Sequence, residues 1–144
     1  MEDELLVDEL KSLVIKQIKT VFPTVSKIYD EPVRQGLKVP AFLVLIINDR
    51  QEKKLGRRIE QEFFFAVTYF PSDERVFYTE ADRVSFTFKT NFRYIANRFH
   101  VHEIEVEKED NTLIITFKVK ATLEEILEEV KMQTLEVHQV AKES

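Results

Sequence analysis

Two histidines, His100 and His102, are the residues whose type and spacing point most directly to chemistry. They lie in HVHEIEVE, a segment that alternates apart from a slip at His102–Glu103, so on a strand their side chains share one face. Paired imidazoles can hold zinc or another transition metal, and Glu105 and Glu107 follow closely. No third ligand stands out, and a half-exposed strand face has the same pattern, so we predict no metal site.

Two sets of carboxylates have a spacing that acid–base chemistry uses. Glu60 and Glu62 share one face of a predicted strand and could act as an acid–base pair. The other set lies on the polar side of a predicted amphipathic helix, which is typical of a solvated face: Glu124, Glu125, Glu128 and Glu129. None of the serines lies in a GxSxG or SxxK motif. We identify no catalytic residues and predict that the protein is not an enzyme.

The composition removes further classes of chemistry. The chain has 144 residues, no cysteine and two glycines, which excludes a disulfide framework, a zinc–cysteine site and a Gly-rich phosphate loop. We expect no cofactor. The net charge of −5 argues against specific binding to nucleic acid. The acidic N-terminus is unlike a secretory signal and the longest apolar run, 41–47, is too short for a membrane span, so we expect no membrane association and assembly in the cytoplasm.

The most distinctive charged segment is 49–58, DRQEKKLGRR. It has five basic residues against two acidic ones, a net charge of +3, and Gly56 supplies a turn residue. The segment joins two predicted strands, so we interpret it as a hairpin tip that docks on an acidic partner or on phosphate. A loop kept soluble by its charge is the alternative. The candidate contact residues are the basic ones: Arg50, Lys53, Lys54, Arg57 and Arg58.

The strand predicted at 59–70 carries aromatic side chains on both faces. Nine of the twelve phenylalanines lie between Phe63 and Phe99. A strand that is apolar on both faces is covered on both sides, so we expect a helix or a neighbouring subunit on each side, with part of the surface covered by another subunit. The candidate interface residues are the aromatic ones: Phe63, Phe64, Phe65, Tyr69 and Phe70.

The periodicity of the chain predicts one α+β domain spanning 1–144. Two helices, at about 3–20 and 74–97, pack on one face of a mainly antiparallel sheet of about four to six strands. A strand from Val84 to Phe92 is the alternative to the second part of the second helix, because VSFTFKTNF also alternates. The predicted strands are 25–29, 42–48, 59–70, 100–107 and 113–119, followed by a short helix near 122–131 and a last short strand at 134–140.

Five short motifs between Ile28 and Pro71, about a third of the chain, resemble a known family. They are Ile28-Tyr29-Asp30, Gln35-Gly36-Leu37, Pro40-Ala41-Phe42, Leu55-Gly56-Arg57-Arg58 and Tyr69-Phe70-Pro71. The sequence resembles the small tail terminator, or tail completion, proteins of tailed phages and prophages of Gram-positive bacteria. Five residues of these motifs are expected to shape loops: Tyr29, Gly36, Pro40, Gly56 and Pro71. The segment Val84–Phe92 departs from the family in being richer in Thr and Phe than a typical helix there.

The resemblance implies a structural protein of the virion tail that is present in the host cytoplasm during assembly. Such proteins form a ring, commonly a hexamer, on the end of the finished tail tube, stop its polymerisation and present the surface that the head connector joins. The implied partners are further copies of the chain, the tail tube protein and the head–tail connector protein. The alternative is a non-catalytic adaptor that binds a protein or nucleic-acid partner through residues 50–58.

Overall fold

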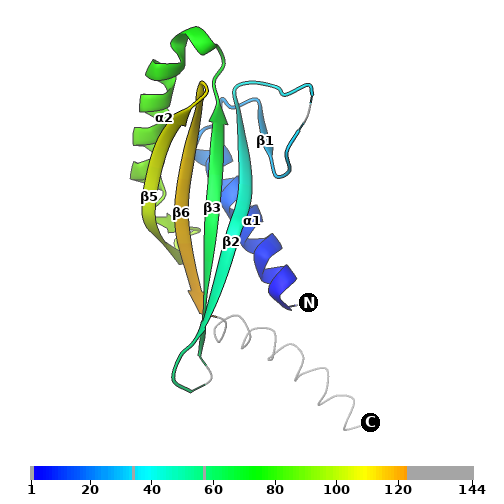
Figure 1. Cartoon of the computed structure of the whole chain (residues 1–144), viewed down its shortest axis with the longest axis vertical. Helices are drawn as coiled ribbons and strands as arrows, with labels where there is room; N and C mark the ends of the chain where they lie inside the picture. The colour runs from blue at the N-terminus through cyan, green and yellow to red at the C-terminus, as the bar shows by residue number, and fades with distance from the viewer. Residues whose placement is uncertain (1, 34, 57, 123–144) are drawn as a thin grey trace.

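The described residues form two α-helices and a six-stranded sheet (Figure 1). The computed structural model describes residues 2–33, 35–56 and 58–122, with side chains from residue 7 onward. The elements are α1 (Glu2–Val21), β1 (Lys27–Tyr29), β2 (Ala41–Lys53), β3 (Ile59–Phe70), the 3-10 turn η1 (Glu74–Val76), α2 (Phe77–Asn91), β4 (Tyr94–Ile95), β5 (Phe99–Glu109) and β6 (Thr112–Thr122).

The strands lie in the order β1-β2-β3-β6-β5-β4. Strand β1 is parallel to β2, and the other neighbouring strands are antiparallel. The predicted α+β fold, with a mainly antiparallel sheet and both helices on one face, is confirmed (Figure 1). The short helix predicted near 122–131 and the strand predicted at 134–140 lie outside the described residues.

Helix α1 forms because its apolar residues recur at helical spacing. Leu10, Val14 and Ile18 are fully buried and lie four residues apart, so they form one stripe along the helix. Lys19 lies in the last turn, where the helix dipole favours a cation. The helix ends two residues before Pro23, which lacks the N–H that a further turn requires.

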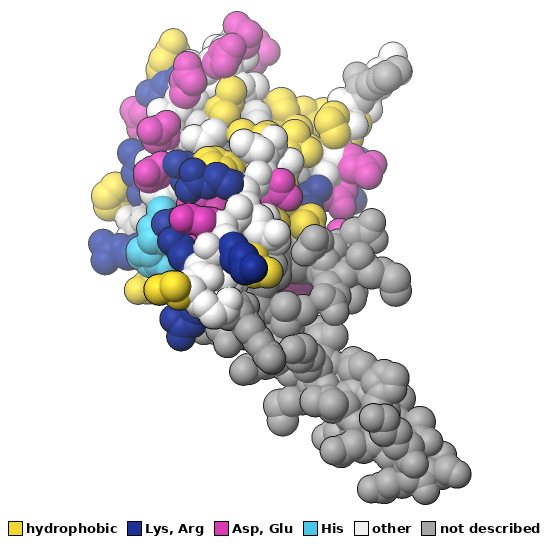
Figure 2. All heavy atoms as spheres, turned by 60° about the horizontal axis from the view of Figure 1, so that its bottom comes forward, with side chains coloured by type: hydrophobic (Ala, Val, Ile, Leu, Met, Phe, Trp, Pro, Cys, Tyr) yellow, Lys and Arg dark blue, Asp and Glu magenta, His cyan; other side chains and the backbone are white. Residues whose placement is uncertain are grey.

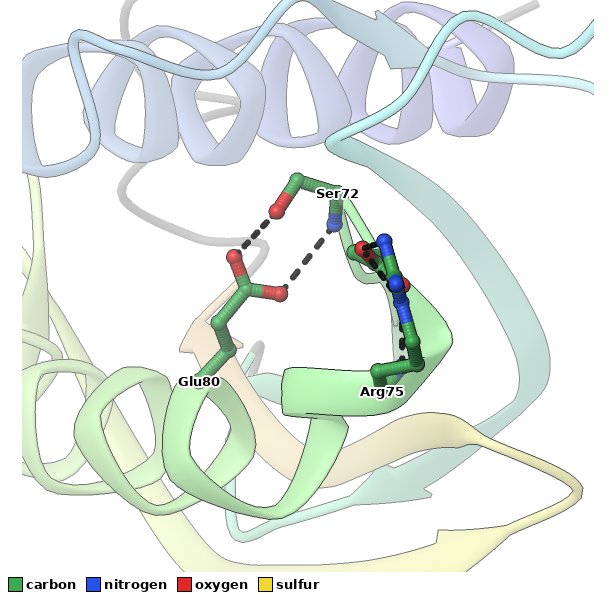
Figure 3. Close-up of polar contacts among 4 residues, drawn as sticks. Ser72, Arg75 and Glu80 are labelled. Atoms are coloured by element: carbon green, nitrogen blue, oxygen red, sulfur yellow. Dashed lines mark hydrogen bonds and ion pairs between the residues drawn. The ribbon is translucent and has the colours of Figure 1, made fainter.

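Helix α2 begins after a polar turn that ties its first residues to the end of β3 (Figure 3). Asp73 accepts hydrogen bonds from the backbone N–H of Arg75 at 2.9 Å and from its guanidinium at 2.8 Å, and the side-chain bond from Arg75 lowers the pKa of Asp73. Glu80 points back to Ser72 and accepts from its backbone N–H at 3.1 Å and from its hydroxyl. Asp73 thereby caps the 3-10 turn η1, and Glu80 in the first turn of α2 ties the helix to Ser72.

The segment in which helix and strand patterns competed is helical, so a strand at Val84–Phe92 is wrong. Val84 and Phe88 are buried four residues apart on one stripe of α2. The ring of Phe88 lies 5.6 Å from that of Phe117 on β6. Packing against the sheet therefore outweighs the strand preference of Thr and Phe, which is a weak and context-dependent effect.

The end of α2 differs from the prediction, because the helix ends at Asn91 rather than near 97. The longer helix was expected because Ile95 continues the apolar spacing, and Ile95 is indeed buried, but from strand β4. The side chain of Gln17 on α1 holds the chain where it leaves the helix. Its amide N–H₂ donates to the carbonyls of Asn91 at 3.0 Å and Tyr94 at 2.8 Å, and its oxygen accepts from the N–H of Ala96 at 2.9 Å.

One hydrophobic core lies between the helices and the sheet face that they cover, which we call the inner face. It includes stacked or tilted aromatic pairs, such as Phe65 with Phe117 at 5.1 Å and Phe42 with Tyr69 at 5.0 Å between ring centroids. The largest fully buried side chains are Phe42, Phe63, Phe65, Phe77, Phe88, Phe92 and Phe117, with Leu10, Ile18, Ile95, Leu113 and Ile115. Most of the phenylalanine excess therefore fills this core.

A bulge in β5 decides which of its side chains face away from the helices. The register with β6 shifts between His102 and Glu105, and Glu103 has a positive φ of 53°. The slip in the alternation of HVHEIEVE is therefore a β-bulge. It keeps His102 and Glu105 on the face opposite the helices, while Val106 packs against the core.

None of the described helices is long and apolar enough to cross a membrane.

Candidate interaction surface

The face of the sheet opposite the helices, which we call the outer face, carries apolar side chains at its centre. None of the described helices covers it. In register across β2, β3 and β6, Thr68 lies between Leu43 and Ile114, and Ala66 lies between Leu45 and Thr116. The central side chains are all partly exposed: Leu43, Leu45, Phe64, Ala66, Thr68, Phe70, Ile114 and Thr116. Contiguous apolar surface of this kind marks protein contact sites.

The five aromatic residues predicted as interface candidates divide between the two faces. Phe63, Phe65 and Tyr69 are 1 %, 0 % and 6 % exposed and lie in the core. Phe64 and Phe70 lie on the outer face and are partly exposed. The helices thus cover one side of β3 as expected, and Phe64 and Phe70 are the two of the five that a partner can reach.

The basic segment is the tip of a long hairpin formed by β2 and β3, which projects beyond the rest of the sheet (Figure 1). The turn closes with a hydrogen bond from the N–H of Lys54 to the carbonyl of Arg58 at 2.9 Å, and Gly56 adopts a positive φ of 77°. Leu55, at the end of the tip, is 97 % exposed. Lys53 and Lys54 are exposed beside it, which confirms a hairpin with a basic tip.

The cations of this segment differ in what they contact. Arg50 pairs with Glu62 at 3.5 Å, and Lys54 pairs with Glu52 at 3.3 Å, with the Lys54 and Glu52 side chains about half exposed. An exposed ion pair such as Lys54–Glu52 contributes little stability. Arg57 lies outside the described residues.

Glu60 and Glu62, considered as an acid–base pair, form ion pairs on the strand face instead. The Glu62 side chain is 6 % exposed and lies between two cations, Arg50 at 3.5 Å and Lys120 at 3.8 Å. Lys120 also reaches Glu60 at 3.6 Å. The Oε1 atom of Glu62 accepts no hydrogen bond within the described residues, so the two cations alone compensate its charge. The two cations reduce the cost of burying this carboxylate, which would be large if it were unpaired.

His100 and His102 contact each other rather than converging on a third ligand. Nδ1 of His100 lies 2.8 Å from Nε2 of His102, and the Tyr94 ring lies 5.1 Å from the His100 ring. Burial, followed by the charges of His100 and Lys120, lowers the pKa of His102. Among the described residues, no group of three His, Asp or Glu side chains gathers here or elsewhere in a way that could hold a metal. Figure 2 shows the histidines, in cyan, beside Lys, Arg, Asp and Glu side chains.

The glutamates of β5 form an acidic row. In the sequence, Glu105 and Glu107 stand out only as possible metal ligands beside the two histidines. Glu103 pairs with Lys118 at 2.6 Å, and this bond lowers the pKa of Glu103. Glu105 and Glu107 instead border a shallow hollow on the outer face, together with Ile114 and Thr116. The alternation of β5 predicts that these glutamates share a face, but only the register with β6 places them beside Ile114.

The residues expected to shape loops lie where the chain reverses. The hydroxyl of Tyr29 accepts a hydrogen bond from the N–H of Lys38 at 3.0 Å. Gly36 adopts a positive φ of 76°, the peptide bond before Pro40 is cis, and Pro71 is buried directly after β3. They lie in the chain around β1 and directly after β3, and Gly56 lies in the turn of the hairpin tip.

A family model described as phage tail terminator protein matches residues 9–135. No curated protein matches the sequence. The matched range includes both helices in large part, all six strands, the outer face and the hairpin tip.

Proposed function

Because the chain belongs to the phage tail terminator family, and therefore has a structural role in a phage tail, we propose that it caps the tail tube. In this role several copies form a ring on the end of the tube. The ring stops polymerisation of the tube protein and presents the surface to which the head connector joins. The partners are the tail tube protein, the connector protein and further copies of the chain.

The outer face is the observation that carries this proposal. The helices already bury the apolar side chains of the inner face, so one chain can form its core without the outer face. Leu43, Phe64, Phe70 and Ile114 nevertheless remain partly exposed on neighbouring strands. A protein that only needed solubility would carry polar residues at such positions. Apolar residues there indicate a surface that other protein chains cover.

The charged groups of the described residues support a structural rather than a catalytic role. Glu62 is compensated by Arg50 and Lys120, and His100 and His102 contact each other. Neither set leaves an acid and a base facing a shared substrate pocket, as general acid–base catalysis requires. A cap has no need of such a pair, since its function lies in the shape and charge of its surfaces.

Electron microscopy of purified tail tubes mixed with the chain tests the proposal. We expect a ring on one end of each tube and no further growth when tube protein is added. A Phe64→Asp variant places a charge on the outer face and should reduce capped tubes at least tenfold. Phe86→Asp is the matched control, because Phe86 is 73 % exposed on α2, and it should cap like the wild-type chain.

Two results would contradict this proposal. In the first, tubes grow equally with and without the chain and carry no ring. In the second, Phe64→Asp caps as well as Phe86→Asp while both variants remain folded by circular dichroism.

A further inference from the structure

The tip of the hairpin combines an apolar side chain with positive charge. Leu55 is 97 % exposed at the turn, with Lys53 and Lys54 immediately before it. A single exposed leucine is common on protein surfaces and identifies nothing by itself. Its position at the end of a projecting hairpin, flanked by cations, gives it the form of an anchor that enters a hollow on another molecule.

The hollow on the outer face has the complementary features. It is a shallow, open hollow of about 430 Å³ between β5 and β6. Ile114 and Thr116 form the side of the hollow nearest the sheet centre, and Glu105 and Glu107 form its acidic rim. Both glutamates are exposed, and neither forms an ion pair with another described residue. The hollow therefore offers apolar contact to a leucine and negative charge to its lysines.

The tip and the hollow of one chain cannot meet each other. The tip joins β2 to β3 at one end of the sheet, and the β5–β6 turn lies at the other end (Figure 1). The hollow is lined by residues on either side of that turn, between 105 and 116. Ile59 begins β3 beside the tip, and Thr68 on the same strand pairs with Ile114. These nine steps along β3 span about 30 Å at the rise of an extended strand. A contact between tip and hollow must therefore join two copies.

We propose that the tip of one copy docks in the hollow of the next, with Leu55 against Ile114 and with Lys53 and Lys54 against Glu105 and Glu107. This contact rests on the proposed ring and specifies how its subunits recognise each other. It uses two different surfaces of the chain, so it is a head-to-tail contact, which closes into a ring when the rotation between copies closes. A phosphate-bearing partner fits the hollow poorly, because Glu105 and Glu107 repel it.

Disulfide trapping tests the contact directly, because the chain contains no cysteine. A chain with Leu55→Cys and Thr116→Cys should, on mild oxidation in the presence of tail tubes, form covalent dimers and higher multimers. A chain with Leu55→Cys and Tyr78→Cys is the matched control, since Tyr78 is 68 % exposed on α2. We expect at least tenfold more multimer from the first chain than from the second, and equal yields would overturn the contact.

A charge exchange provides a second, independent measurement. Lys53→Glu with Lys54→Glu should reduce capped tubes at least tenfold, and so should Glu105→Lys with Glu107→Lys, because each places like charges across the contact. The chain with all four substitutions should recover capping to within a few fold of the wild-type chain. Failure of that recovery, with all variants folded by circular dichroism, would overturn the contact.

The outcomes separate this inference from the proposed function. If wild-type rings form on tubes but trapping or recovery fails, the head-to-tail contact is wrong and the capping function stands. If the wild-type chain forms no ring on tubes, the proposed function is wrong and the contact that rests on it is wrong as well.

Discussion

The inner and outer faces of the sheet are built from the same strands but are completed in different ways. On β3, Phe63 and Phe65 enter a core that α1 and α2 enclose, whereas Phe64 between them lies on a face that none of the described helices covers. The comparison shows that alternate residues of one strand can have two separate roles. The inner residues hold the chain together, and the outer residues are available to other molecules.

The largest expected effect contrasts two neighbouring phenylalanines. Phe65→Ala removes a fully buried ring that stacks on Phe117 at 5.1 Å, so the free energy of unfolding should fall by about 3–5 kcal/mol. Phe64→Ala removes a partly exposed ring over which the Lys118 ammonium lies at 4.9 Å, and should lower it by about 1 kcal/mol. Urea unfolding measures both values. Equal losses would show that the outer face is as essential to the monomer as the inner face.

A smaller effect concerns the polar attachment that fixes the helix layer over the inner face. Gln17 makes three hydrogen bonds, to Asn91, Tyr94 and Ala96. Gln17→Ala should lower the free energy of unfolding by about 1–2 kcal/mol, because water replaces these partners only in part. Lys16→Ala, at an exposed position of the same helix, is the control and should change it by less than about 0.5 kcal/mol. Equal decreases in the free energy of unfolding of the two variants would show that Gln17 does not stabilise the helix layer in this way.

The smallest expected effect is a pH dependence at the polar end of the outer face. The pKa of His102 is lowered in the folded chain from its ordinary value of 6.5, so the unfolded chain takes up this proton first as the pH falls. The stabilisation that comes from keeping His102 neutral is therefore fully present above the pKa of His102 in the unfolded chain. It is lost as the pH decreases through and below 6.5. The wild-type chain should lose more stability between about pH 7.5 and about pH 5.5 than a His102→Asn variant. Identical losses, measured by urea unfolding, would contradict the lowered pKa.

The fold was largely predictable from residue patterns, because its strongest patterns agree with its packing. The stripe of Leu10, Val14 and Ile18 predicts α1, and the two-residue alternation of 59–70 predicts β3 and its two faces. The end of α2 was not predictable in the same way. Ile95 continues the helical spacing of apolar residues although it lies on β4. Gln17, whose side chain holds this segment, lies far away in sequence.

The candidate surface was predictable only in parts. The charge of 49–58 and the turn residue Gly56 indicate the basic tip. Alternation shows that Phe64 and Phe65 face opposite ways, but not which of them faces the helices, since both faces of the strand are aromatic. The slip in alternation at His102–Glu103 marks the bulge in the sequence, but the hollow beside Glu105 and Glu107 also depends on the register of β5 with β6, a long-range feature that local patterns do not specify.

The central claim, that other protein chains cover the outer face in the assembled tail, is tested most directly by hydroxyl-radical footprinting. Labelling of Phe64 and Phe70 is measured for the free chain and for the chain bound to tail tubes, with Phe86 as the internal reference because it is 73 % exposed on α2. We predict that labelling of Phe64 and Phe70 falls severalfold on the tubes while that of Phe86 is unchanged. Undiminished labelling of Phe64 and Phe70 on capped tubes would contradict the claim.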